Sequence, residues 1–189
     1  MARVHSVPMA TDLAWGAPLT EDDLATMPDD GHRYELIDGS LIVTPAPGLH
    51  HQICVTALGA LLGTNGPPEL RVLVAPFDVR LSRLTVLQPD VLVAPKSDFG
   101  EARLEQAPVL AVEVLSPSTR RIDLGTKRLA FEAAGVTAYW LVDPDGPNLT
   151  VLELHDQGRY VERGTVTGDE TYHATIPFPV TVVPARLLD

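Results

Sequence analysis

Residues 109–115 form the run VLAVEVL, which is apolar at every position except Glu113. A short continuous apolar run of this kind predicts a strand in the middle of a sheet, with both of its faces covered by other elements. The chain must therefore fold in layers around this strand. An ionised carboxylate there costs free energy unless it is paired or neutralised, so Glu113 needs a chemical reason.

Two neighbouring strands precede this run. Residues 71–83 and 85–94 have the patterns of strands in a mixed or antiparallel sheet, and the second carries Asp90 directly after a proline. Beyond the central strand, IDLGTKRLAFEAAG predicts a helix over 123–134 with Asp123 as its N-cap and a glycine as its stop. Two core strands thus each deliver one carboxylate ahead of this helix.

Turn signals and apolar periodicity predict the remaining elements. They are a β-hairpin over 33–44 that turns at Asp38-Gly39, a helix over 49–62, a strand over 138–142 and a hairpin over 149–163. No internal repeat and no linker divides these elements. With 189 residues and 45% hydrophobic content the chain can build one core.

We expect this core in a single domain over residues 28–189. A flexible segment, residues 1–27, should precede it, with at most one short helix near 20–25 in which Thr20 caps and Asp23 completes a capping box. The lone cysteine, Cys54, should pack inside a helix, and it excludes an internal disulfide framework. We also expect no membrane insertion and a cytoplasmic protein, since the sequence shows no leader pattern and no apolar run near the ~18 residues that span a bilayer.

The net charge of −11 restricts how the chain could hold nucleic acid. It has the wrong sign for binding mainly through counterion release from phosphates. It counts less against an enzyme, because carboxylates that bind divalent cations belong to the negative total. Walker, GxGxxG, HExxH and GxSxG motifs are missing from the sequence, which leaves P-loop, dinucleotide, zinc-protease and α/β-hydrolase chemistry without support.

Asp90 and Glu113 are the first candidates for chemistry. Taken singly, Asp90 could finish a turn and Glu113 could face water from an edge strand. Buried side by side, they would raise one another's pKa unless a cation neutralised them. Two carboxylates with water and a phosphate oxygen suit Mg²⁺ or Mn²⁺, which need few protein ligands.

Lys127 is the third candidate, on the basis of helical spacing. It lies three residues after Leu124 and four before Phe131, so the pattern places it on the inward stripe of its helix. Its ammonium could then reach the carboxylate pair, an attacking water or a phosphate oxygen. The alternative is a lysine at the sheet margin with its charge in water.

Several sequence blocks occur in the order typical of one bacterial family. They are LIDGSLIVTPAP followed by LHHQ, then QPDVLVAP, AVEVLSPSTRRIDLGTK and GVTAYWLVDP. Over residues 28–155 the chain resembles the family named putative restriction endonuclease, of the PD-(D/E)xK nuclease superfamily. The resemblance implies an α/β (α+β), restriction-endonuclease-like core in which helices flank a central mixed sheet, with an N-terminal hairpin, C-terminal strands and a homodimer.

The resemblance also assigns positions. Asp90 matches the aspartate of the PD element and Glu113 the second acid. The superfamily's usual lysine, two residues after that acid, is replaced here by Leu115. Proteins similar to this one are thought to take the lysine from the following helix, which here is Lys127.

Five further residues are candidates around this centre. Glu35 resembles an additional acid of such sites, although a surface ion pair with a cation such as Arg33 explains it equally well. His51 matches a family histidine that either orients water or phosphate or is a hydrogen-bonded core residue. The remaining candidates are Gln88, as support beside Asp90, and Arg120 and Arg121, as phosphate contacts.

The sequence thus predicts an Mg²⁺-dependent (or Mn²⁺-dependent) endonuclease that acts on nucleic acid, with DNA as the first expectation. Asp90 and Glu113 would bind the metal, and Lys127 would position or deprotonate the attacking water, with Glu35 as a further acid. A nuclease-like fold that acts only as a binding or assembly module is the alternative. Hydrolysis of RNA or of a small nucleotide would need the same metal chemistry.

Overall fold

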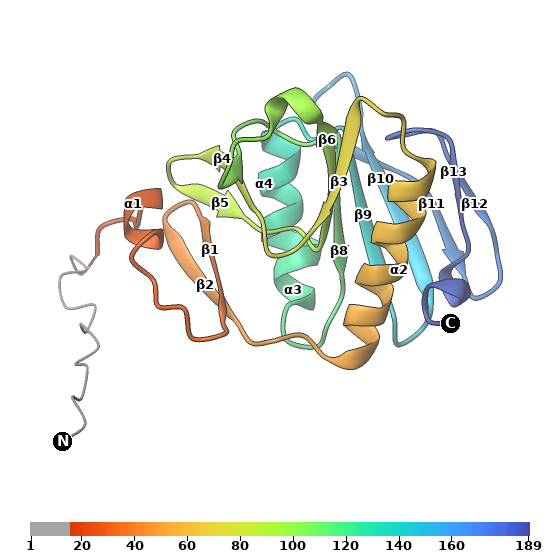
Figure 1. Cartoon of the computed structure of the whole chain (residues 1–189), viewed down its shortest axis with the longest axis horizontal. Coiled ribbons are helices and arrows are strands. Elements are labelled where there is room, and N and C mark those ends of the chain that lie inside the picture. The colour runs from red at the N-terminus through yellow and green to blue at the C-terminus, as the bar shows by residue number, and fades with distance from the viewer. Residues whose placement is uncertain (1–15) are drawn as a thin grey trace.

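Two β-sheets meet along one long, bent hairpin in the computed structural model, which describes residues 16–189 (Figure 1). The strands of this hairpin are β3 (Leu70–Val74), β4 (Asp78–Ser82), β5 (Thr85–Leu87) and β6 (Val91–Pro95). Near the turn β4 pairs with β5 in the smaller sheet, and near the open end β3 pairs with β6 in the larger one. Pro76 and Pro89 interrupt the two arms, because a proline cannot donate a ladder hydrogen bond.

The larger sheet is mixed, in the order β11-β10-β9-β8-β6-β3. Its other strands are β8 (Leu110–Val114), β9 (Ala138–Asp143), β10 (Asn148–Leu154) and β11 (Tyr160–Thr167). Only β8 and β9 run parallel, and a helical crossover joins them as parallel strands require. The strand expected over 109–115 therefore lies inside the sheet, as predicted.

The smaller sheet has the order β2-β1-β5-β4-β7. The strands not yet described are β1 (Arg33–Ile37), β2 (Ser40–Thr44) and β7 (Arg103–Leu104). Asp38 and Gly39 turn the first hairpin with φ of 49° and 76°, the positive values that a two-residue hairpin turn demands. This hairpin is confirmed, and its strand β1 pairs with β5, the part of the bent hairpin that continues through Pro89 into the larger sheet.

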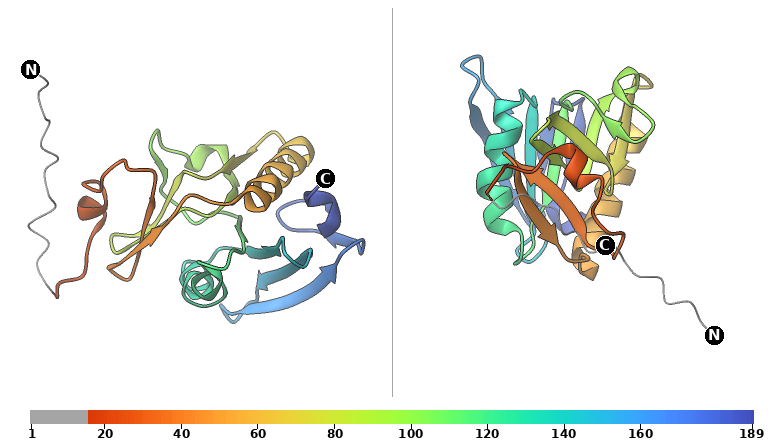
Figure 2. Two further views of the ribbon diagram at one scale, coloured as in Figure 1. Left: turned by 90° about the horizontal axis from the view of Figure 1, so that it is seen from below. Right: turned by 90° about the vertical axis from the view of Figure 1, so that its left-hand side faces the viewer.

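Helices cover both faces of the larger sheet, as expected (Figures 1 and 2). α2 (Leu49–Asn65) packs Leu58 and Leu62 against the face that carries Trp140. α4 (Arg128–Ala133) covers the opposite face, where the ring of Phe131 lies 5.4 Å from that of Tyr139. Consecutive strand residues point to opposite faces, so Tyr139 and Trp140 each anchor one layer.

The crossover helix differs from the expectation in its start and its phase. It consists of α3 (Arg120–Ile122), a π-helical turn η2 (Asp123–Lys127) and α4. The predicted N-cap at Asp123 is wrong, since Thr119 occupies the N-cap position, without a side-chain capping hydrogen bond, and Asp123 is buried inside the segment. The π turn also leaves Leu124 43% exposed, so the inward stripe contains Lys127 and Phe131 but not Leu124.

The ends of the chain pack around these layers. Residues 1–15, part of the expected flexible segment, lie outside the described residues. α1 (Glu21–Leu24) has the predicted capping box, and Glu21 binds Arg80 and Arg103 of the smaller sheet, which ties this segment to the domain. The other short elements are η1 (Lys96–Asp98), β12 (Tyr172–Ala174), β13 (Val180–Val182) and η3 (Pro184–Leu187). From residue 16 onward, no helix is long and apolar enough to cross a membrane.

Candidate active site

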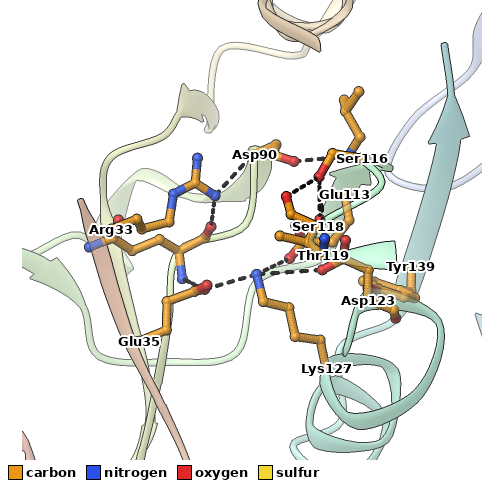
Figure 3. A network of polar contacts seen from close by, with 12 residues as sticks. Arg33, Glu35, Asp90, Glu113, Ser116, Ser118, Thr119, Asp123, Lys127 and Tyr139 are labelled. Carbon is orange, nitrogen blue, oxygen red and sulfur yellow. Dashed lines mark hydrogen bonds and ion pairs between the residues drawn. The ribbon is translucent and has the colours of Figure 1, made fainter. Parts of the chain in front are cut away.

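Acidic side chains from both sheets converge where the bent hairpin passes from one sheet to the other (Figure 3). Asp90 directly precedes β6, and Glu113 lies on β8, the neighbour of β6. β1 of the smaller sheet adds Glu35, and the crossover helix adds Asp123 and Lys127. All five line one pocket of about 190 Å³, which we call the catalytic pocket.

Lys127 is the centre of a buried ion cluster. Its Nζ lies 2.9 Å from Glu35 Oε1, 3.1 Å from Glu113 Oε1 and 3.8 Å from Asp123 Oδ1. The lysine is only 2% exposed, so it is not a marginal surface charge. Burial disfavours its charge, yet the neighbouring carboxylates, Glu113 first, raise the pKa of Lys127 and keep the ammonium protonated.

Asp90 has a different set of partners. Its Oδ1 accepts a hydrogen bond from Arg33 Nη1 at 3.0 Å, and its Oδ2 accepts one from the Val114 backbone N–H at 2.9 Å and contacts His51 Nε2 at 3.1 Å. Burial opposes ionisation, but His51, Arg33 and the backbone donor together hold the pKa of Asp90 below its ordinary value. Asp90 is therefore an ionised carboxylate.

The cluster carries more buried acid than cation. Glu35, Asp90, Glu113 and Asp123 are each at most 2% exposed. Among the described residues that line the catalytic pocket, the only permanent cations are Lys127 and Arg33. Burial accordingly raises the pKa of Glu113 well above its usual range and that of Asp123 to about 6, despite the opposing charge of Lys127. With all four carboxyls ionised the pocket would carry a surplus of two negative charges, which a divalent cation would balance.

The structure brings some of the predicted supporting residues to the site and leaves others outside it. His51 lines the catalytic pocket from the first turn of α2, and its Nδ1 is buried without a partner. Gln88 contributes through its backbone N–H, which donates to Glu35 Oε1 at 2.7 Å, while its side chain turns away. Arg120 pairs with Asp143, and neither Arg120 nor Arg121 lines the pocket, so the structure does not bring them to the site.

Glu35 is not the surface residue that the alternative interpretation required. It is 1% exposed and pairs with Lys127, while Arg33 pairs with Asp90 instead. Arg33 and Asp123 also line the catalytic pocket, although neither was predicted as a site residue. Each has a local signal: Arg33 shares a strand face with Glu35, and Asp123 stands one helical turn before Lys127.

The donor set fits a hard divalent cation. Within residues 16–189 no group of three or more His, Cys, Asp or Glu side chains is arranged to hold a metal ion. Mg²⁺ commonly takes only one or two carboxylates and completes its shell with water and substrate oxygens. Asp90 and Glu113 supply such a pair on neighbouring strands, and the catalytic pocket has room for several waters of roughly 30 Å³ each.

Asp123→Asn should stabilise the metal-free protein at pH 8. Burial lifts the pKa of Asp123 from 3.8 to about 6, so its ionisation opposes folding as the pH rises through this window. A neutral amide removes a penalty of at most about 3 kcal/mol at pH 8 and gains almost nothing near pH 4. Urea denaturation in EDTA at both pH values measures this difference. Asp156→Asn, in an exposed turn, is the control, and an equal effect of Asp123→Asn at both pH values would contradict the assignment.

Comparisons with known proteins agree with the family resemblance of the sequence and with the fold. The profile of the Uma2 family, described as "putative restriction endonuclease", matches residues 21–185. A solved structure of a putative nuclease of DUF820 from Anabaena variabilis superposes with a TM-score of 0.69 at 20% identity, covering 90% of this chain and 98% of that one. This second likeness shows a shared fold. Among curated proteins, none matches the chain.

Proposed function

Because the chain belongs to the Uma2 family, named putative restriction endonuclease, we propose that it is a nuclease that hydrolyses phosphodiester bonds in DNA with Mg²⁺ or Mn²⁺ as cofactor. The observation that carries the proposal is the lysine-centred acid cluster in the catalytic pocket. Three buried carboxylates around one ammonium, with a fourth, Asp90, in the same pocket, cost the fold free energy, and such groups are typical of catalytic sites.

Asp90 and Glu113 would hold the cofactor. When bound, a divalent cation supplies an activated water and offsets the negative charge that develops on the phosphorus oxygens. Asp90 would be ionised before the cation binds, since Arg33, His51 and the Val114 N–H stabilise its charge. Arg33 also lines the pocket, so its guanidinium can turn from Asp90 to a substrate phosphate.

Lys127 would orient the attacking water and stabilise negative charge as a permanent cation. Of the two roles expected from the sequence, positioning fits better than deprotonation of water, because the raised pKa keeps Lys127 protonated. Glu35 and Asp123 fix the direction of the ammonium, and the Gln88 N–H fixes Glu35 in turn. A preorganised charge of this kind needs no rearrangement during the reaction.

A non-catalytic binding or assembly module is the competing function. The net charge of −11 favours it, since such a surface repels a polyanion. Calorimetry with Mg²⁺ on the parent and on Glu113→Ala separates the two, because a scaffold has no need of the cation. DNA rather than RNA or a small nucleotide, the homodimer and the cytoplasmic location remain predictions.

Purified protein should nick supercoiled plasmid DNA in Mg²⁺ or Mn²⁺ and stop when EDTA removes the cation. The reason is that Asp90 and Glu113 alone offer no activated water to the phosphorus. Gel electrophoresis with plasmid, single-stranded DNA and RNA measures the cleavage and ranks the substrates. Intact plasmid and oligonucleotides in both cations would lead us to abandon the nuclease proposal.

A further inference from the structure

A second pocket of about 480 Å³ adjoins the catalytic pocket. We call it the side pocket. Arg33, Asp90 and the segment 45–47 line both cavities, so a strand whose phosphate lies at Asp90 would place a neighbouring nucleotide here. Its volume is within the roughly 300–1,000 Å³ of pockets that bind small molecules. Nothing in the proposed hydrolysis uses this space.

The walls of the side pocket suit a flat, apolar ring. His32 and Tyr34 line it with their rings 6.4 Å apart, and Pro45, Pro47 and Val55 add aliphatic surface. The Tyr34 hydroxyl donates a hydrogen bond of 2.8 Å to Asp30, which fixes the ring in place. Aromatic side chains fixed in this way stack on nucleobases of any sequence.

The floor of the side pocket presents hydrogen-bond acceptors. Asp78 of β4 and Gln88, next to β5, come together because their strands pair, and Gln88 Nε2 donates to Asp78 Oδ1 at 2.7 Å. Gln88 Oε1 is buried without a partner, and an orphaned buried acceptor is costly. Asp29, Asp78 and Asp90 also make this lining acidic, with Arg33 as its one permanent cation among the residues described. A phosphate is therefore disfavoured, and a group that donates hydrogen bonds is favoured.

We propose that the side pocket binds one unpaired, amino-bearing nucleobase of the strand whose phosphodiester occupies the catalytic pocket. The proposal rests on the proposed nuclease function. Carboxylate and amide oxygens accept from the exocyclic amino group of cytosine, adenine or guanine, whereas thymine has none. In a duplex these amino groups are exposed only along the grooves, and a pocket that takes in the whole ring needs an unpaired base, so the substrate would be single-stranded or locally opened DNA. Base contacts of this kind also explain how a chain of charge −11 could hold nucleic acid with few phosphate contacts.

Single-stranded oligo-dC and oligo-dT of equal length provide the test, because both are pyrimidines and only cytosine carries an amino group. Fluorescence anisotropy in Ca²⁺ should show oligo-dC bound about 10-fold more tightly than oligo-dT, a difference typical of one good base contact. Asp78→Asn should bring the ratio near one, because the new amide can donate as well as accept. Tyr34→Leu should weaken both ligands about equally, and Asp156→Asn should change neither.

Equal binding of the two oligomers by the parent, or an unchanged ratio in a folded Asp78→Asn variant, would overturn the proposal. Deoxycytidine monophosphate is included as a competitor, and displacement as strong as that by oligo-dC would show that a free nucleotide, not a strand, is the ligand. The assay needs no cleavage. Selective binding of oligo-dC by a protein that leaves DNA intact would therefore remove the nuclease proposal and keep the side pocket.

Discussion

Asp90→Asn should lower the rate of plasmid cleavage by about 1,000-fold, the loss expected when several kcal/mol of transition-state stabilisation disappear. The change keeps the size of the side chain but removes its charge and one of its two acceptor oxygens. Asp90 needs both acceptor oxygens, since Arg33 binds one while the Val114 N–H and His51 share the other. Single-turnover nicking rates in Mg²⁺ and in Mn²⁺ measure the loss.

Two further measurements separate lost chemistry from lost folding. Glu113→Gln should lower the cleavage rate to a similar extent, because Glu113 would supply the second carboxylate. Calorimetry should show weaker Mg²⁺ binding in both variants. Asp156→Asn, in the exposed turn between β10 and β11, should cleave like the parent. An Asp90→Asn protein that melts like the parent and still cleaves at the parental rate would exclude Asp90 from the reaction.

The elements of the fold were predictable where one local pattern dominated. The apolar run around Glu113 became β8, and Asp38-Gly39 closed a hairpin as expected. The division of the sheet was not predicted, since it depends on which distant strands pair on each side of the bend. Pro76 and Pro89 were the only local signals of this division. A proline shows where strand pairing is interrupted, but not which strand pairs on the far side of the interruption.

The site residues, too, were predictable where the signal was local and not where it depended on the surrounding structure. Asp90, Glu113 and Lys127 stood out because charge in an apolar pattern is visible in the sequence. Asp123 did not, because a residue that follows a loop and starts a helical pattern has the usual signature of an N-cap. Only the π turn, which Tyr139 supports by donating to the Asp123 carbonyl at 3.0 Å, turns that carboxylate toward the site.

A lysine from a helix can replace one from the strand because chemistry depends on where the ammonium lies. Leu115, at the superfamily's usual lysine position, is 5% exposed and belongs to the core beneath the crossover helix. The helix packs over this core and brings Lys127 Nζ within 3.1 Å of Glu113. The strand thereby keeps its apolar packing, and the helix supplies the charge.

Lys127→Met should abolish cleavage and also reduce the free energy of unfolding at pH 8 by about 3–5 kcal/mol, the cost of leaving buried charges without their partner. Glu35, Glu113 and Asp123 would then face one another with no ammonium between them. Burial already raises the pKa of Glu113 and Asp123, and loss of the cation raises both further. Since stability tied to a raised pKa is lost as the pH rises through it, the defect should shrink at pH 5.

The double variant Lys127→Met/Glu113→Gln distinguishes the electrostatic role of the lysine from its catalytic one. Removing one buried carboxylate along with the ammonium should recover part of the lost stability, because the remaining charges repel less. It should recover no cleavage. Urea denaturation at pH 5 and pH 8, beside plasmid nicking, measures both effects. If Lys127→Met alone cleaved DNA at the parental rate, the ammonium would be a structural charge with no part in catalysis.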